Sequence, residues 1–310
     1  MNQEAFLEYN TLKYTKTGRE QLLFELTERF NLHEFFLPFD PSRAPQIEKI
    51  SLHLRAALGM IDSDTIRESG IPVKVRNKQS YRKRLAGTNN KSLKEIAGIA
   101  VSSGALECES DVHIHDACGG NGILSASISN LRGTHKTHSI CWDRDQSCEK
   151  RHDLLRLSVG LRSKLLHFML SNVLEADLAQ IESMPTFCLS KHACGSATDI
   201  IVKKTFDLKA SRTPVRTVLL TCCHGKAKDF PPFEKDTITF EEWNVLARTA
   251  DWTQSKNSLE TQTVGRVAMR VIDTLRVVRN SRTDLRAWVE ELASPEISTK
   301  NHGIIIEKID

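Results

Sequence analysis

The segment from Asp116 to Gly122 combines an acidic side chain with closely spaced glycines, in the order Asp-Ala-Cys-Gly-Gly-Asn-Gly. An apolar run, Val112–His115, precedes it, and a helical pattern, Ile123–Leu131, follows it. Glycines let the backbone turn sharply and approach a ligand closely, and the helix N-terminus offers N–H groups. The spacing differs from the Gly-x-Gly-x-x-Gly of dinucleotide sites. It suits S-adenosylmethionine, which has no phosphate, and the predicted contacts are Asp116, Ala117, Cys118, Gly119, Gly120 and Gly122.

Acidic side chains follow two further apolar runs. The run Ser139–Trp142 ends at Asp143-Arg144-Asp145, where a carboxylate can accept both ribose hydroxyls of a nucleoside. Asp177 follows the run Leu166–Leu170, where a carboxylate can receive the adenine amino group. The alternative for any single acid is a solvated loop residue. We predict that Asp143, Arg144 and Asp177 complete the cofactor site.

Two more runs, Thr186–Ser190 and Val215–Leu220, end in groups that could do acid–base chemistry. Ligands of an open α/β sheet lie outside the carboxyl ends of the strands, so these groups could converge on one pocket. Lys191 is predicted to contact the cofactor and to act on the acceptor, as a cation or as a desolvated base. His192 or His224 could act as the base instead, because histidine titrates near neutrality. The alternative for each histidine is a structural, hydrogen-bonded role.

The chain has eight cysteines but no Cys-x-x-Cys pair. A zinc site could be drawn from Cys194, Cys222, Cys223 and His224, although adjacent cysteines make awkward tetrahedral ligands. Reduced, largely buried thiols are the favoured interpretation. We therefore predict no metal.

The elements that must position these groups follow from periodicity. Residues 1–90 are predicted to form a helical N-terminal extension with helices at Glu20–Phe30 and Ile47–Met60. From residue 91 to residue 310, apolar runs alternate with helical segments and end in two strands, Arg286–Leu292 and Gly303–Lys308. This alternation predicts an α/β fold of class I Rossmann-like methyltransferase type. Its sheet should have seven mostly parallel strands with helices on both faces.

The 310 residues carry a net charge of +4, and the distribution of the charge is uneven. Seven basic residues and no acid lie between Lys74 and Lys91, a stripe that could neutralise RNA phosphates. A solvated linker is the alternative. No run of 18 apolar residues and no secretory signal is present, so we expect an intracellular protein without a membrane partner, with cytoplasm, nucleus and mitochondrion all open. The predicted RNA contacts are Lys74, Arg76, Lys78, Arg82, Lys83 and Arg84.

Several of these motifs resemble one family. The segment Lys191–Asp199 is similar to the Lys-His-Leu-Cys-Gly-x-Ala-Thr-Asp signature of the eukaryotic tRNA 2′-O-methyltransferases that modify the fourth nucleotide of the acceptor stem. Cys222-Cys223-His224 resembles the start of that family's Cys-Cys-His-His segment, and Phe240–Trp252 resembles the stretch that follows it. Ile272–Arg276 is similar to its Ile-Asp-x-x-Arg helix. The likeness spans roughly residues 92–308 in the right order and implies methylation of tRNA.

The departures from the family pattern are specific. No cysteine precedes Cys108, so the family's N-terminal zinc modules are absent from this sequence. Ala193 replaces the signature leucine, and Gly225 replaces the second histidine. These changes leave three alternatives open beside tRNA: ribosomal RNA as the substrate, a catalytically silent RNA-binding or ribosome assembly factor, and methylation of a protein or small molecule. Arg276 is expected near the pocket or in a surface ion pair.

Overall fold

The computed structural model describes residues 16–57 and 90–309, except 133–134, 159–164, 182, 192, 228–237, 254–256, 279, 281, 295, 297 and 299. The RNA contacts predicted at Lys74, Arg76, Lys78, Arg82, Lys83 and Arg84 therefore lie outside the described residues, as does His192.

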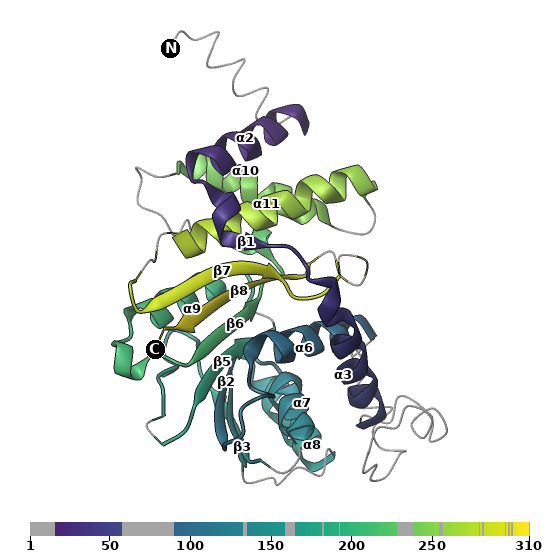
Figure 1. Ribbon diagram of the computed structural model, residues 1–310, viewed down its shortest axis with the longest axis vertical. Helices are drawn as coiled ribbons and strands as arrows, with labels where there is room; N and C mark the ends of the chain where they lie inside the picture. Colours follow the sequence, from purple (N-terminus) through teal and green to yellow (C-terminus); the bar gives the residue numbers. More distant parts are fainter. Residues whose placement is uncertain are drawn as a thin grey trace.

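The described residues form one eight-stranded sheet in the order β1-β7-β8-β6-β5-β2-β3-β4 (Figure 1). β8 runs antiparallel to both of its neighbours, and every other pairing is parallel. The strands are β1 (Phe36–Leu37), β2 (Val112–Ala117), β3 (Thr137–Asp143), β4 (Leu166–Leu170), β5 (Thr186–Ser190), β6 (Arg216–Leu220), β7 (Leu285–Glu291) and β8 (His302–Lys308).

The order β4-β3-β2-β5-β6 repeats the 3-2-1-4-5 arrangement of doubly wound nucleotide-binding sheets. Beyond β6, the antiparallel strand β8 lies between β6 and β7, which is the edge that the class I methyltransferase fold has. The predicted fold class and all seven predicted strands are confirmed. The order of the strands reverses between β2 and β5, and the segments Asp116–Gly122 and Lys191–Asp199 follow these two strands.

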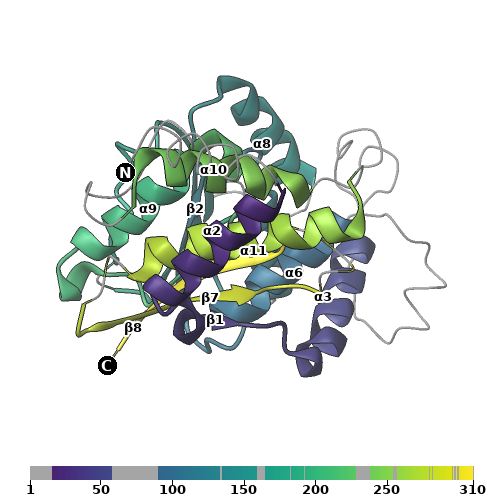
Figure 2. The same ribbon diagram turned by 90° about the horizontal axis from the view of Figure 1, so that it is seen from above.

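Helices cover both faces of the sheet (Figures 1 and 2). Ile96, Leu124 and Leu54 belong to the core on one face, whereas Ile201 and Phe206 pack on the other. Val112–Ala117 and Thr186–Ser190 are buried along their whole length, as central parallel strands require. The helices on the first face are α3 (Ala44–Ala57), α6 (Asn90–Ser103), α7 (Ile123–Leu131) and α8 (Gln146–Ser158), and α9 (Ser196–Asp207) lies on the second.

A helical layer beside β7 and β8 contains α2 (Lys16–Arg29), α10 (Phe240–Ala250) and α11 (Leu259–Val278). Their apolar faces share a cluster around Trp243 and Leu26, so the beginning of the described chain packs on its C-terminal third (Figure 1). The N-terminal extension also supplies β1, which pairs with β7 and was not predicted. A strand of two residues is too short to show a hydrophobic period in the sequence. No helix in the described ranges is both long and apolar enough to cross a membrane.

Gly98 provides a test of how closely α6 approaches the sheet edge. A Cβ atom at this position would lie 2.2 Å from the backbone carbonyl oxygen of Leu292, the residue after β7. Alanine favours helices over glycine by about 1 kcal/mol, but here its methyl group would push α6 away from β7. We expect Gly98→Ala to lower the free energy of unfolding by roughly 1–3 kcal/mol in urea denaturation. The exposed variant Glu149→Ala on α8 should change it little, and a stabilised Gly98→Ala protein would contradict this packing.

Candidate functional site

The loop between β2 and α7 turns sharply beneath an open space. Gly120 adopts a φ of 59° and its would-be Cβ meets no atom within 4 Å, so a ligand can approach the backbone there. Cys118 has a φ of 56°, which is costly for a residue with a side chain and is typical of functional loops. The Gly122 N–H donates to the Gly119 carbonyl at 2.9 Å and closes the turn before α7. The predicted loop therefore has the shape that a close backbone contact requires.

Asp116 supports this loop from below. Its side chain is fully buried, and Oδ2 accepts a hydrogen bond from the Ser125 N–H at 3.2 Å, in the first turn of α7. Burial raises the pKa of Asp116 to about 6. Oδ1 has no hydrogen-bond partner among the described residues, and the would-be Cβ of Gly119 lies 2.5 Å from the Asp116 carboxyl carbon. Asp116 thus supports the loop, and its contact with a cofactor stays a prediction.

Asp143 ends β3 beside the loop. Its Oδ2 accepts from the Gly120 N–H at 2.8 Å, and its Oδ1 accepts from the Asp145 N–H at 2.9 Å. Each carboxylate oxygen keeps a second lone pair, so Asp143 can still receive ligand hydroxyls. The charge of Arg144 reaches the Cys118 thiol, which places Arg144 near the same loop. Asp143 is thereby held at the carboxyl edge of the sheet, as predicted.

Asp177 does not reach this edge. Its Oδ1 accepts from the Ala179 N–H, and its Oδ2 lies 3.1 Å from Nη2 of Arg212, a residue that precedes the amino end of β6. The chain after β4 has by then turned back towards the start of β5, because Gln180 donates to the Arg212 carbonyl. The prediction that Asp177 receives an adenine amino group is therefore corrected. Ser171, whose N–H donates to the Asp143 carbonyl, begins the segment that does border the site.

Lys191 lies at the tip of β5, on the other side of the strand reversal from the loop. Its ammonium nitrogen lies 3.4 Å from Oε2 of Glu95 on α6, and both side chains are largely buried. Glu95 also accepts a hydrogen bond from the Ser298 hydroxyl at 2.9 Å. The charge of Lys191 reaches Asp116 and lowers its pKa against the effect of burial. Sequence reasoning missed Glu95, because a single acid within a helix 96 residues from Lys191 gives no signal.

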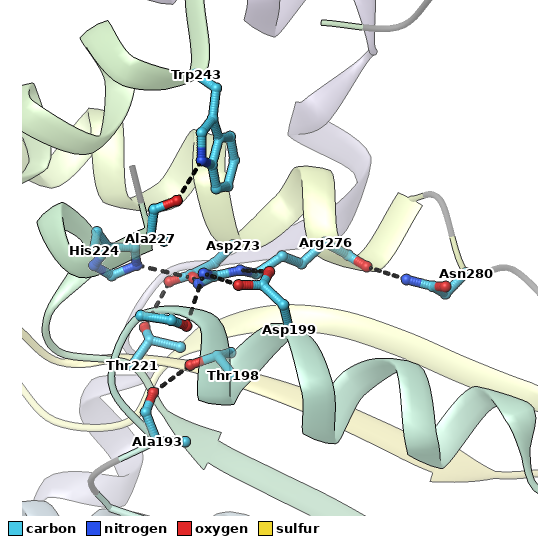
Figure 3. A network of polar contacts seen from close by, with 11 residues as sticks. Ala193, Thr198, Asp199, Thr221, His224, Ala227, Trp243, Asp273, Arg276 and Asn280 are labelled. Carbon is cyan, nitrogen blue, oxygen red and sulfur yellow. Dashed lines mark hydrogen bonds and ion pairs between the residues drawn. The ribbon is translucent and has the colours of Figure 1, made fainter. Parts of the chain in front are cut away.

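The residues that carried the family resemblance meet in one buried network (Figure 3). Arg276 on α11 forms two hydrogen bonds with Asp199 on α9, at 2.7 and 3.0 Å, and a third with Asp273 at 2.9 Å. Asp273 in turn accepts from the Thr221 hydroxyl at 2.6 Å and contacts His224 Nε2 at 2.9 Å. The network joins α9, α11 and the loop after β6, so Arg276 lies in the interior and not in a surface ion pair.

Opposite charges within this network offset the cost of burying its carboxylates. Although burial alone would raise it, the pKa of Asp273 is lowered to about 2 by the charges of His224 and Arg276 and by hydrogen bonds from His224 and Thr221. His224 is 2% exposed, and one of its ring nitrogens is occupied by Asp273. The structure therefore places the predicted base His224 in a structural contact, while Lys191 lies at the edge of the site.

Three cysteine side chains gather beside this network. Cys194 Sγ lies 2.9 Å from Cys222 Sγ, and Cys222 Sγ lies 3.5 Å from Cys223 Sγ. All eight cysteines of the chain are free thiols in the structure. The pKa of Cys223 is lowered, because the Cys194 and Cys222 thiols hydrogen-bond to its sulfur and Lys300 and Lys226 lie nearby. The two motifs after β5 and β6 therefore converge, as the sheet topology predicted.

Gly225 explains one departure from the family pattern. A Cβ atom at this position would lie 1.9 Å from Oδ2 of Asp251, at the end of α10. A histidine here, as in the Cys-Cys-His-His segment, would require Asp251 to move. The loss of that histidine is thus matched by the local packing.

Known proteins resemble this chain over part of its length or at low sequence identity. No family model matches the chain. Curated proteins named "Glutathione S-transferase C-terminal domain-containing protein" from human and mouse are 26% identical over 145 residues, which is 44% of this chain and 22% of theirs. A Drosophila melanogaster homologue is 25% identical over 37% of this chain and 21% of its own length. The chain thus spans about a fifth of the length of the curated relatives it matches.

Solved structures similar in shape include a putative rRNA methylase from Clostridium thermocellum, with a TM-score of 0.40 and 12% identity over 69% of this chain and 96% of that one. A putative S-adenosyl-L-methionine-dependent methyltransferase from Methanococcus maripaludis has a TM-score of 0.42 and 11% identity over 78% of this chain and 98% of its own. The assignment of the fold rests on the chain's own strand order.

Removing Arg276 should test whether the buried network holds the site together. Arg276→Leu keeps the volume but leaves the Asp199 and Asp273 carboxylates without their cation. Breaking a buried ion pair from one side costs about 3–5 kcal/mol, and we expect that loss of stability in urea denaturation. Lys203→Met is the matched control, because it removes a cation from an exposed carboxylate on α9 and should cost under about 1 kcal/mol. Equal losses in the two variants would contradict the role given to the network.

Proposed function

We propose that the protein binds S-adenosylmethionine at the carboxyl edge of β2 and β3 and transfers its methyl group to a ribose 2′-hydroxyl of RNA. The observation that carries the cofactor assignment is the pair formed by Asp143 and the Gly120 N–H, at 2.8 Å. It sets a carboxylate for ribose hydroxyls next to a backbone that lies open to a ligand. The pair lies next to the point where the strand order reverses, at which doubly wound sheets bind ligands.

Bound S-adenosylmethionine supplies a methyl group on a positively charged sulfur. The residues of this chain have to orient the acceptor oxygen and stabilise the charge that develops on it as its proton leaves. Lys191 is suited to this because Glu95 holds its ammonium group beside the loop, on the far side of the strand reversal. As a cation, it can donate a hydrogen bond to an oxygen that is losing its proton.

Support for RNA as the acceptor comes from the sequence. The motifs of residues 191–199, 222–224 and 272–276 resemble those of the tRNA 2′-O-methyltransferases, and one residue or more of each motif meets in one buried network. Lys74 to Lys91 would supply phosphate contacts. Transfer RNA is the first candidate, and ribosomal RNA, free or in a ribosomal particle, is the second.

A second candidate function is RNA binding without methyl transfer, as a scaffold or assembly factor. The observation that favours it is the burial of Lys191, whose side chain is 8% exposed. This second function predicts that the protein binds RNA but transfers no methyl group. Methylation of a protein or a small molecule predicts turnover that does not depend on the basic stripe.

Cofactor binding can be tested by calorimetric titration with S-adenosylmethionine. We expect Asp143→Asn to weaken binding by about tenfold or more, because it removes a charge-assisted acceptor for two hydroxyls. Asp177→Asn is the matched control and should change the affinity less than about twofold, since Asp177 pairs with Arg212 in this structure. If the wild-type chain releases no heat and shows no thermal shift, the cofactor assignment is wrong.

Methyl transfer can be followed with radiolabelled S-adenosylmethionine and bulk tRNA or ribosomal RNA. We expect Lys191→Ala to abolish transfer while cofactor affinity stays within a few fold, because the lysine acts on the acceptor. Lys203→Ala, an exposed lysine of α9, should leave transfer unchanged. Full turnover by Lys191→Ala would remove Lys191 from the mechanism. RNA binding by the wild type with no transfer to any RNA would favour the silent scaffold.

A further inference from the structure

Three thiols from two loops form a compact group at the carboxyl edge of the sheet. Cys194 follows β5, while Cys222 and Cys223 follow β6. The three sulfur atoms all lie within 4.8 Å of one another, and each side chain is half-buried. The sulfur atoms of Cys194 and Cys222 lie 2.9 Å apart, much farther than the bond of about 2.05 Å in a disulfide.

The two loops are held together by contacts that do not involve the sulfurs. Gly195, next to Cys194, has a φ of 60°, and its would-be Cβ lies 2.8–3.0 Å from Cβ, C and O of Lys226. Arg276 donates to the Gly195 carbonyl at 3.3 Å, and His224, next to Cys223, contacts Asp273. The buried network therefore fixes the backbone on both sides, so the three thiols are brought together in advance.

The spacing of the sulfurs fits one tetrahedral metal ion. Zinc binds thiolates at about 2.3 Å, which places two sulfurs of a tetrahedral site about 3.8 Å apart. Cys222 and Cys223 are already 3.5 Å apart, so their adjacency in the sequence is no obstacle. The Cys194–Cys222 pair has to open by less than 1 Å. Three soft sulfur ligands favour zinc over magnesium or calcium.

We propose that Cys194, Cys222 and Cys223 together bind one zinc ion, with the fourth position open to a water molecule or a substrate atom. Each thiol gives up its proton to water as its sulfur–zinc bond forms. The resulting site has a net charge of −1, and Lys226 and Lys300 lie close enough to balance it. His224 does not belong to this group of ligand atoms, and its Nε2 contacts Asp273.

This proposal departs from our sequence-based prediction that the chain has no metal. That prediction rested on the awkwardness of adjacent cysteines and on irregular spacing along the chain. The fold removes both objections, because Cys222 and Cys223 hold their sulfurs 3.5 Å apart and the third thiol comes from the loop after the neighbouring strand β5. A zinc ion here would hold the loop that follows Lys191 against the loop that follows β6. Its binding would not require S-adenosylmethionine.

The test is a cobalt titration of the full chain, stripped with a chelator under reducing conditions. We expect one Co²⁺ per chain, an intense thiolate-to-cobalt charge-transfer band, tetrahedral d–d bands, and displacement of cobalt by one equivalent of zinc. Cys194→Ser, Cys222→Ser and Cys223→Ser should each weaken binding by more than about 100-fold, beyond the usual effect of second-layer residues. Cys108→Ser is the control, because this half-buried thiol lies outside the cluster.

Circular dichroism checks that each variant is folded, and a folded variant of any one of the three cysteines is sufficient for the comparison. Absence of the charge-transfer band in the wild type would overturn the proposal, and so would unchanged cobalt affinity in all three serine variants. A Cys194–Cys222 disulfide in protein purified without reductant, in place of bound zinc, would overturn it as well. Methyl transfer is not read in this experiment, so its outcome is separate from that of the proposed function.

Discussion

The buried pairing of Arg276 with Asp199 and Asp273 is the interaction on which the arrangement of the site depends. Three charged side chains, each under 9% exposed, have been removed from water, which is costly unless the charges are paired and fully hydrogen-bonded. Here Arg276 bonds to both carboxylates and to the Gly195 carbonyl (Figure 3). The geometry links the first turn of α9 to the last two turns of α11. It therefore fixes the two loops that carry Lys191 and the three thiols.

The other half of the site depends on the sheet. Parallel strands bring their carboxyl ends to one edge, and the reversal of strand order separates the connections of β2 and β5 onto opposite faces. The loop of Asp116 to Gly122 and the tip bearing Lys191 therefore flank one crevice. Asp116 lies beneath the loop, Asp143 lies beside it, and Glu95 reaches Lys191 from α6. Each of these groups is held by a partner from a different element.

Much of this could be predicted from the sequence. The seven main strands follow from apolar runs that end in acids, glycines or basic residues, and the placement of Asp143 at a strand end follows from the same pattern. The prediction for Asp177 failed because a count of residues after β4 does not show where the loop turns back towards β5. Glu95 and β1 could not be predicted, since both depend on contacts between distant segments. Gly225 departs from the motif because the Asp251 carboxylate occupies the space that a side chain there would need.

The most direct test of the account is a crystal structure of the chain with S-adenosylhomocysteine, the product that methyl transfer would leave. We expect the ribose hydroxyls on the Asp143 carboxylate, the amino-acid end along the backbone of Gly120, and the sulfur facing the side of the crevice that bears Lys191. A ligand bound elsewhere, or a Gly120 loop that stays empty at saturating ligand, would contradict it.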